Sequence, residues 1–105
     1  KAPHFNYVGD SILGYDCNLG AGVKIANFKA FGTLIRSAGK DTGLRKFGGA
    51  IGDEVSLGCN AVVSPGTLIG PRTVAYNGVM LRGVYAPDSI VKLRQEVDVG
   101  AKRQV

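Results

Sequence analysis

The only histidine of the 105-residue chain, His4, stands in the stretch PHFNYVG, three positions before Tyr7. An imidazole held beside a reacting group can remove a proton near neutral pH, and a general base placed in this way contributes about 10²–10⁴-fold to a rate. The ordinary alternative is a polar side chain at the edge of a domain. Which interpretation holds depends on the elements that position His4.

Bulky apolar residues recur every six positions along most of the chain, at Leu13, Leu19, Ile25 and Phe31, and again at Ile51, Leu57, Val63, Ile69, Ala75 and Leu81. A small residue follows most of them. Neither the 3.6-residue period of a helix nor the two-residue period of a strand explains this pattern. It is typical of a solenoid in which each hexad forms a short strand and a corner, and three hexads form one triangular coil. We therefore predict one all-β domain over residues 1–105, a left-handed parallel β-helix, and expect it to be part of a longer chain.

Two segments depart from the period. The interval from Phe31 to Ile51 is 20 positions (51 − 31), which is not a multiple of six, and it predicts an extended loop over residues 37–50 that is rich in glycine and cations. Near the other end, Asp88 and Ser89 precede apolar residues that share one helical face, at Ile90, Leu93 and Val97. A short C-terminal helix over about residues 89–97, covering the last coil, is expected there.

Composition narrows the classes of partner. No apolar run approaches the roughly 20 residues that span a bilayer, so we expect a cytoplasmic protein without a membrane partner. Cys17 and Cys59 stand apart from each other and from any histidine cluster, which predicts reduced thiols and no structural metal. The formal charge of +5 is dispersed, which argues against nucleic acid and favours a phosphorylated small molecule.

Three stretches, PHFNYVGDS, NLGAGVKIAN and TGLRKFGGAIGD, carry a family resemblance. Together they resemble the acetyltransferase domain of the bifunctional N-acetylglucosamine-1-phosphate uridyltransferase/glucosamine-1-phosphate acetyltransferase family and related sugar-phosphate nucleotidyltransferases. The similarity runs from about Pro3 to Gln95. It implies transfer of an acetyl group from acetyl-CoA to an amino sugar phosphate such as glucosamine 1-phosphate, in a sugar-nucleotide biosynthetic protein that is a homotrimer.

The resemblance also implies roles for single residues in the acceptor site. The family's general base, which deprotonates the sugar amine, matches His4, and the residue that contacts the sugar phosphate matches Tyr7. Asn27, which follows His4 by 23 positions (27 − 4), would hold the acceptor. Lys29 is the one lysine close behind it that could bind the acceptor's phosphate.

For coenzyme A, the resemblance places the backbone of Ala21 against the thioester and makes Arg94 a rough counterpart of an arginine that binds the cofactor. The loop cations Arg45 and Lys46 are expected to meet its phosphates. Because other phosphate-binding residues of the family have no match in this chain, a second interpretation stays open. It is a non-catalytic trimerisation or ligand-binding module with a decayed acetyltransferase site.

Overall fold

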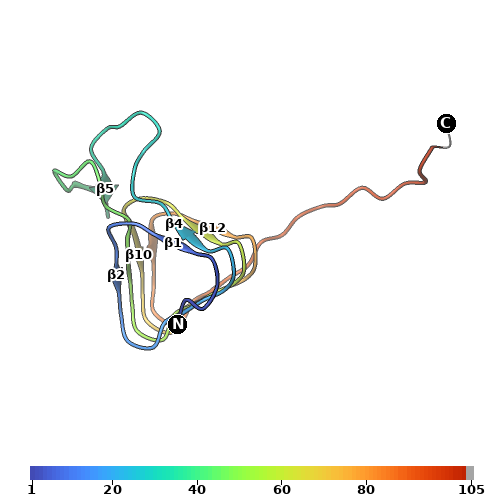
Figure 1. Ribbon diagram of the computed structural model, residues 1–105, viewed down its shortest axis with the longest axis horizontal. Helices are drawn as coiled ribbons and strands as arrows, with labels where there is room; N and C mark the ends of the chain where they lie inside the picture. The colour runs from blue at the N-terminus through green and yellow to red at the C-terminus, as the bar shows by residue number, and fades with distance from the viewer. Residues whose placement is uncertain (104–105) are drawn as a thin grey trace.

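The computed structural model describes residues 1–103, and the last two residues of the predicted domain lie outside the described residues. The chain winds as a triangular prism with one parallel four-stranded sheet on each side (Figure 1). Sheet A has the order β1 (Tyr7–Val8), β4 (Lys24–Ile25), β9 (Val62–Val63), β12 (Met80–Leu81). Sheet B has the order β13 (Val84–Tyr85), β10 (Thr67–Ile69), β7 (Gly49–Ile51), β2 (Ile12–Leu13). Sheet C has the order β14 (Ile90–Val91), β11 (Val74–Ala75), β8 (Ser56–Leu57), β3 (Asn18–Leu19).

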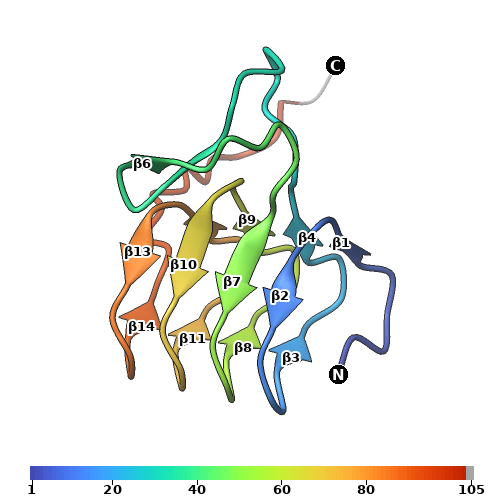
Figure 2. The same cartoon turned by 90° about the vertical axis from the view of Figure 1, so that its left-hand side faces the viewer.

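The predicted parallel β-helix is confirmed, and its strand register gives three hexads per coil. Thr67 pairs with Gly49, 18 positions earlier (67 − 49), and the strands of successive coils stack in parallel (Figure 2). Between the first two coils of sheet B, however, Ile12 pairs with Ala50, 38 positions on (50 − 12). The 20 additional residues form most of an excursion that leaves the prism.

The core confirms the six-residue pattern. Eight of the predicted apolar anchors are at most 3% exposed, namely Leu19, Ile25, Ile51, Leu57, Val63, Ile69, Ala75 and Leu81. Smaller residues two positions earlier fill the space between them and are buried as well, at Cys17, Val23, Val55, Ala61, Thr67, Thr73 and Val79. The corners repeat with the same period, because left-handed backbone recurs at Asp10, Asp16 and Gly22 and again at Glu54, Asn60, Gly66, Arg72 and Gly78.

Two predicted anchors were wrong. Phe31 is 94% exposed because the chain has already left the prism at that point, so its place in the six-residue count is coincidental. Leu13 is 39% exposed because β2 is the edge strand of sheet B among residues 1–103.

The excursion spans residues 27–48, so the predicted loop over 37–50 began too late and ended too late. It contains an antiparallel hairpin of β5 (Arg36–Ser37) and β6 (Lys40–Asp41), and the residues after it already form β7. Its base is closed by two backbone hydrogen bonds, Phe47 N–H to the Asn27 carbonyl and Gly48 N–H to the Asp10 carbonyl, each 3.0 Å long. The fully buried Ile35 anchors it internally.

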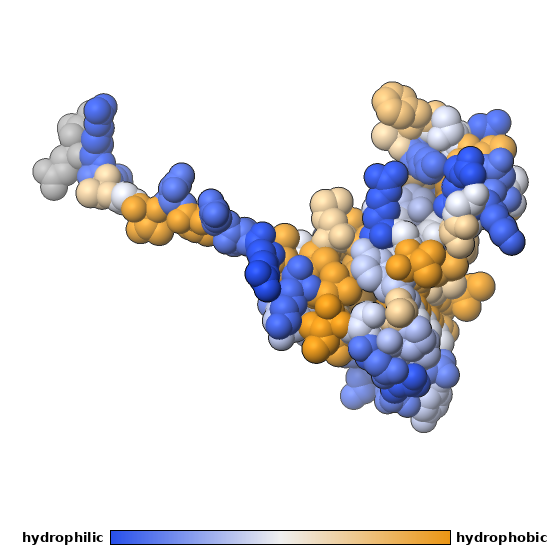
Figure 3. Space-filling model, turned by 180° about the vertical axis from the view of Figure 1, so that it is seen from behind, coloured by the Kyte–Doolittle hydropathy of each residue, from blue (hydrophilic) through white to orange (hydrophobic). Residues whose placement is uncertain are grey.

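The predicted C-terminal helix over 89–97 is absent. Ile90 and Val91 instead form β14, because Val74 N–H donates to the Ser89 carbonyl and Tyr76 N–H donates to the Val91 carbonyl, which continues the parallel coil. After β14 the chain runs out from the prism as an extended tail (Figure 1). Apolar side chains gather at the uncovered end of the prism where the tail begins (Figure 3). Residues 1–103 contain no helix that could cross a membrane.

Candidate active site

A chain of three polar side chains joins the first two coils. Tyr7 Oη donates to Asn27 Oδ1 at 2.9 Å, and Asn27 Nδ2 donates to Asp10 Oδ2 at 2.6 Å. Strand register explains why they meet, since Tyr7 pairs with Lys24 and Val8 pairs with Ile25, which stacks the corner after β1 on the residues that follow β4. We call Tyr7, Asn27 and Asp10 the amide relay.

Gly9 makes room for the relay. A Cβ atom at this position would lie 2.5 Å from Asn27 Cγ and 2.8 Å from Tyr7 Cε2, closer than real Cβ contacts. A glycine between β1 and the corner therefore lets both side chains lie flat against the backbone. Asp10 and Gly9 were not predicted as site residues, although both belong to the quoted stretch PHFNYVGDS.

His4 lies in the exposed bend that precedes β1. Its imidazole has no hydrogen bond or ion pair with any other residue in the 1–103 range, so the structure joins Tyr7 and Asn27 but not His4. The exposed position leaves its ring free to meet a ligand.

Ala21 lies at the corner between β3 and β4, six positions before Asn27. Its carbonyl accepts from Asn60 N–H at 2.9 Å, whereas its own N–H has no acceptor among the described residues. At the comparable corner positions, Tyr15 N–H donates to Asp53 Oδ1 and Cys59 N–H donates to Asn77 Oδ1. Gly20, just before Ala21, stacks against Cys59, whose side chain has no oxygen to accept a hydrogen bond. The Ala21 N–H therefore remains available as a donor.

A cavity of about 900 Å³, whose lining starts at Phe28 directly after Asn27 in the chain, opens between the excursion and two corners of the prism. The excursion contributes Phe28, Lys29 and Arg36 to its lining, and the corners contribute Ser64–Gly66 and Arg82–Val84. Lys29, Arg36 and Arg82 line it without any carboxylate, although Asp41 outside the lining lies 3.6 Å from Arg36. A cavity with this charge suits a phosphate group. Lys29 was predicted, and the two arginines were missed because they are distant in sequence from the motif.

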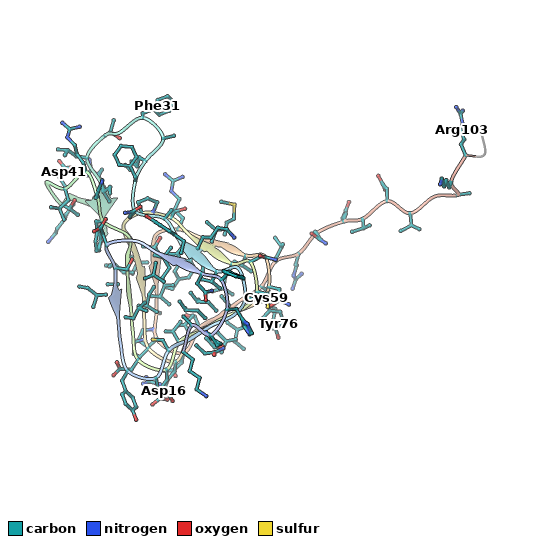
Figure 4. All side chains as sticks on the ribbon, in the orientation of Figure 1. Asp16, Phe31, Asp41, Cys59, Tyr76 and Arg103 are labelled. Carbon is teal, nitrogen blue, oxygen red and sulfur yellow. The ribbon has the colours of Figure 1, made fainter. Side chains whose placement is uncertain are left out.

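The residues predicted to bind coenzyme A are scattered. Arg45 Nη1 donates to the Gly32 carbonyl at 2.9 Å and braces the excursion, while Lys46 is exposed. Arg94 lies in the extended tail rather than on a helix. Figure 4 shows the excursion residues Phe31 and Asp41 on the opposite side of the prism from the tail, so these cations do not form one cluster.

The two cysteines form no disulfide with each other. Cys17 is buried and Cys59 is exposed, and both are free thiols. Among residues 1–103, no three histidine, cysteine or acidic side chains come together as a metal site.

The chain was compared with protein-family models, with curated proteins and with solved structures. No family model matches the chain. It is 31% identical to a bifunctional protein GlmU of Methanococcus aeolicus over 107 residues, covering 99% of this chain and 26% of the relative. It is 40% identical to a bifunctional sugar-1-phosphate nucleotidylyltransferase/acetyltransferase of Sulfurisphaera tokodaii over 85 residues, covering 77% of this chain and 21% of the relative. The chain thus spans about a quarter of the length of these relatives.

Among solved structures, serine acetyltransferase isoform 3 of Entamoeba histolytica, in complex with cysteine, superposes with a TM-score of 0.69. The match covers 90% of this chain and 29% of that one at 19% identity, and it supports the fold alone.

Proposed function

Because the chain is related to the bifunctional sugar-1-phosphate nucleotidylyltransferase/acetyltransferases and resembles their left-handed β-helix domain, we propose that it is an acetyl-CoA-dependent N-acetyltransferase. Its acceptor is an amino sugar phosphate such as glucosamine 1-phosphate. The observation that carries this proposal is the hydrogen bond between Tyr7 and Asn27, with a cation-lined cavity that begins at the next residue, Phe28.

In the proposed reaction, His4 removes a proton from the ammonium group of the acceptor, because only the neutral amine has the lone pair needed for attack. The amine nitrogen attacks the thioester carbon and a C–N bond forms. The nitrogen then releases its second proton to water, the carbonyl re-forms, and the C–S bond breaks. The departing sulfur of coenzyme A takes up the proton from the imidazolium. The Ala21 N–H can stabilise the oxyanion of the tetrahedral intermediate, since a fixed donor at that point is worth more in the transition state than in the ground state.

Substrate binding is assigned to the relay and the cavity. Tyr7 and Asn27 hold the acceptor, and its phosphate enters the cavity near Lys29, Arg36 and Arg82. Charge-assisted contacts of this kind are stronger than neutral hydrogen bonds. Lys46 and the free donors of Arg45 are assigned to the phosphates of coenzyme A. Arg94, in the tail on the other side of the prism, would meet them only across a contact with a second copy of the chain.

The assembly proposed is a homotrimer. The outward side of sheet B presents only apolar residues at Ile12, Ala50, Leu68 and Val84, and two of them are more than 60% exposed. Closed threefold contacts would bury this face without leaving an open-ended surface. A non-catalytic trimerisation or ligand-binding module is the second candidate, favoured by the absence of any partner for His4 within residues 1–103.

Product analysis separates the two candidates. Purified protein is incubated with acetyl-CoA and with glucosamine 1-phosphate or glucose 1-phosphate, and mass spectrometry follows acetylated product. N-acetylated product from the amino sugar alone is expected. Binding of either sugar phosphate without product would favour the non-catalytic module, and acetylation of the hydroxyl compound would contradict the proposed acceptor.

A further inference from the structure

We propose that Asp10 is a positioning residue, which fixes the orientation of the Asn27 side-chain amide. The relay would then present one N–H of Asn27 and the oxygen lone pairs of Tyr7 to the bound acceptor. The consequence for turnover rests on the proposed function, whereas the orientation itself is a property of the chain.

The direction of the relay follows from hydrogen-bond capacity. An ionised carboxylate only accepts, so Asn27 must turn its NH₂ group toward Asp10. Its carbonyl oxygen then faces Tyr7, which must donate. Asn27 Nδ2 lies 2.6 Å from Asp10 Oδ2, which is short, as expected for a charge-assisted hydrogen bond. The hydrogen bond between the neutral partners Tyr7 and Asn27 is longer, at 2.9 Å.

Without Asp10 this direction would be undetermined. A tyrosine hydroxyl both donates and accepts, so it is compatible with either face of an amide that is rotated by 180°. The backbone is held independently, since the Asn27 carbonyl accepts from Phe47 N–H and the Asp10 carbonyl accepts from Gly48 N–H. The carboxylate of Asp10 therefore selects between two amide orientations on a fixed frame.

The orientation leaves a defined set of free groups. Asn27 keeps one N–H, Tyr7 Oη keeps its lone pairs, and Asp10 keeps its second oxygen, none of which has another partner among the described residues. One donor for a substrate oxygen lies beside acceptors for an amine or ammonium hydrogen. A rotated amide would present an oxygen in place of the donor.

Asp10→Asn isolates the effect at almost constant volume. Asparagine tolerates left-handed backbone as well as aspartate does, and φ at Asp10 is 43°. Asp16→Asn is the matched control, because Asp16 lies one hexad later with φ of 53° and its side chain has no hydrogen bond within residues 1–103.

A third variant separates positioning from stability. In the double variant Asp10→Asn, Asn27→Asp, the carboxylate at position 27 can accept from Tyr7 and from the new amide at position 10. Both hydrogen bonds return, but the free donor at position 27 is lost. Recovery of the thermal midpoint would show that the two hydrogen bonds stabilise the fold, whereas kcat reports separately on the Asn27 donor that Asp10 orients.

The experiment follows the side-chain NH₂ signals of Asn27 in ¹H–¹⁵N spectra of the purified protein. These signals are assigned by their loss in Asn27→Asp. The values of kcat and KM and the thermal midpoint are measured for each variant. In Asp10→Asn, we expect the Asn27 signals to shift and kcat to fall about tenfold or more, while Asp16→Asn resembles wild type. The double variant should regain the thermal midpoint but not kcat.

Two outcomes would overturn the proposal: Asn27 signals and kcat in Asp10→Asn that match the Asp16→Asn control, or recovery of kcat in the double variant. If the wild-type protein transfers no acetyl group, the proposed function fails. The Asn27 signals of Asp10→Asn then decide alone whether Asp10 orients the amide.

Discussion

At the scale of single residues, Gly9 sets how closely Tyr7 and Asn27 approach the backbone. In Gly9→Ala, the new methyl group would lie 2.5 Å from Asn27 Cγ and must displace it. Because the backbone of Gly9 is not in the left-handed region, the substitution introduces no backbone strain. We expect acetyl transfer to fall about tenfold or more, through loss of a hydrogen-bonded geometry at the site, with the fold retained.

The control for this substitution is Gly100→Ala, which meets no atom within 4 Å. Turnover is measured with saturating acetyl-CoA, and folding is followed by the thermal midpoint. Wild-type turnover in Gly9→Ala would mean that Asn27 does not hold the acceptor.

The site was predictable only in part. The sequence indicated Tyr7 and Asn27, whose side chains the structure joins, but their catalytic roles stay predictions. It did not reveal Arg36 and Arg82, because they reach the cavity through the path of the excursion and through coil stacking. No local sequence motif indicates the course of the excursion or which residues coil stacking brings to the cavity.

At the scale of elements, the stacked apolar column carries the stability of the coils. Leu57 is 1% exposed and lies in register between Leu19 and Ala75. Leu57→Ala should lower the free energy of unfolding by about 2–5 kcal/mol, since a coil held on both sides cannot collapse into the space. Denaturant unfolding measures the change. Leu34→Ala, at a position that is 44% exposed, should cost much less, and equal losses would contradict the stacking.

A charged pair joins two corners that stack on each other in the last two coils. Arg72 Nε donates to Asp88 Oδ1 at 2.7 Å, and this bond with Arg72 lowers the pKa of the Asp88 carboxyl below its ordinary value. A lowered pKa means that the stabilisation is present above the ordinary aspartate value and is lost as pH falls through the folded-state pKa. Both side chains are exposed, so the effect is small.

Asp88→Asn should therefore be slightly less stable than wild type at pH 7, and the difference should vanish as pH falls below about 4. Chemical unfolding at a series of pH values provides the measurement. A difference that persists unchanged at pH 2 would show that the pair contributes through something other than charge.

The six-residue pattern predicted the coils because stacked strands need the same type of residue at the same position in each coil. The predictions of a C-terminal helix and of the excursion's bounds were wrong for physical reasons. Ile90 and Val91 suit a helical face, but pairing with Val74 and Ala75 continues an existing sheet. Phe31 falls in phase with the anchors although the chain has left the prism, and periodicity alone cannot detect such a departure.

At the scale of the whole molecule, sheet B offers an uncovered apolar side. We expect light scattering to give three times the 11.0 kDa mass of the chain at micromolar concentration. Val84→Asp, on a residue that is 61% exposed, should shift the mass toward the monomer because a carboxylate would be buried in the contact. A wild-type monomer, or a trimer that Val84→Asp leaves intact, would contradict assembly through sheet B.

Acetyl transfer with His4 as the base is tested by the rate of coenzyme A release from acetyl-CoA by His4→Ala. With glucosamine 1-phosphate as the acceptor, this rate should fall about 10²-fold or more below wild type, with unchanged mass and thermal midpoint, because the exposed His4 makes no hydrogen bond or ion pair within residues 1–103. Wild-type release by His4→Ala would show that His4 is not the base.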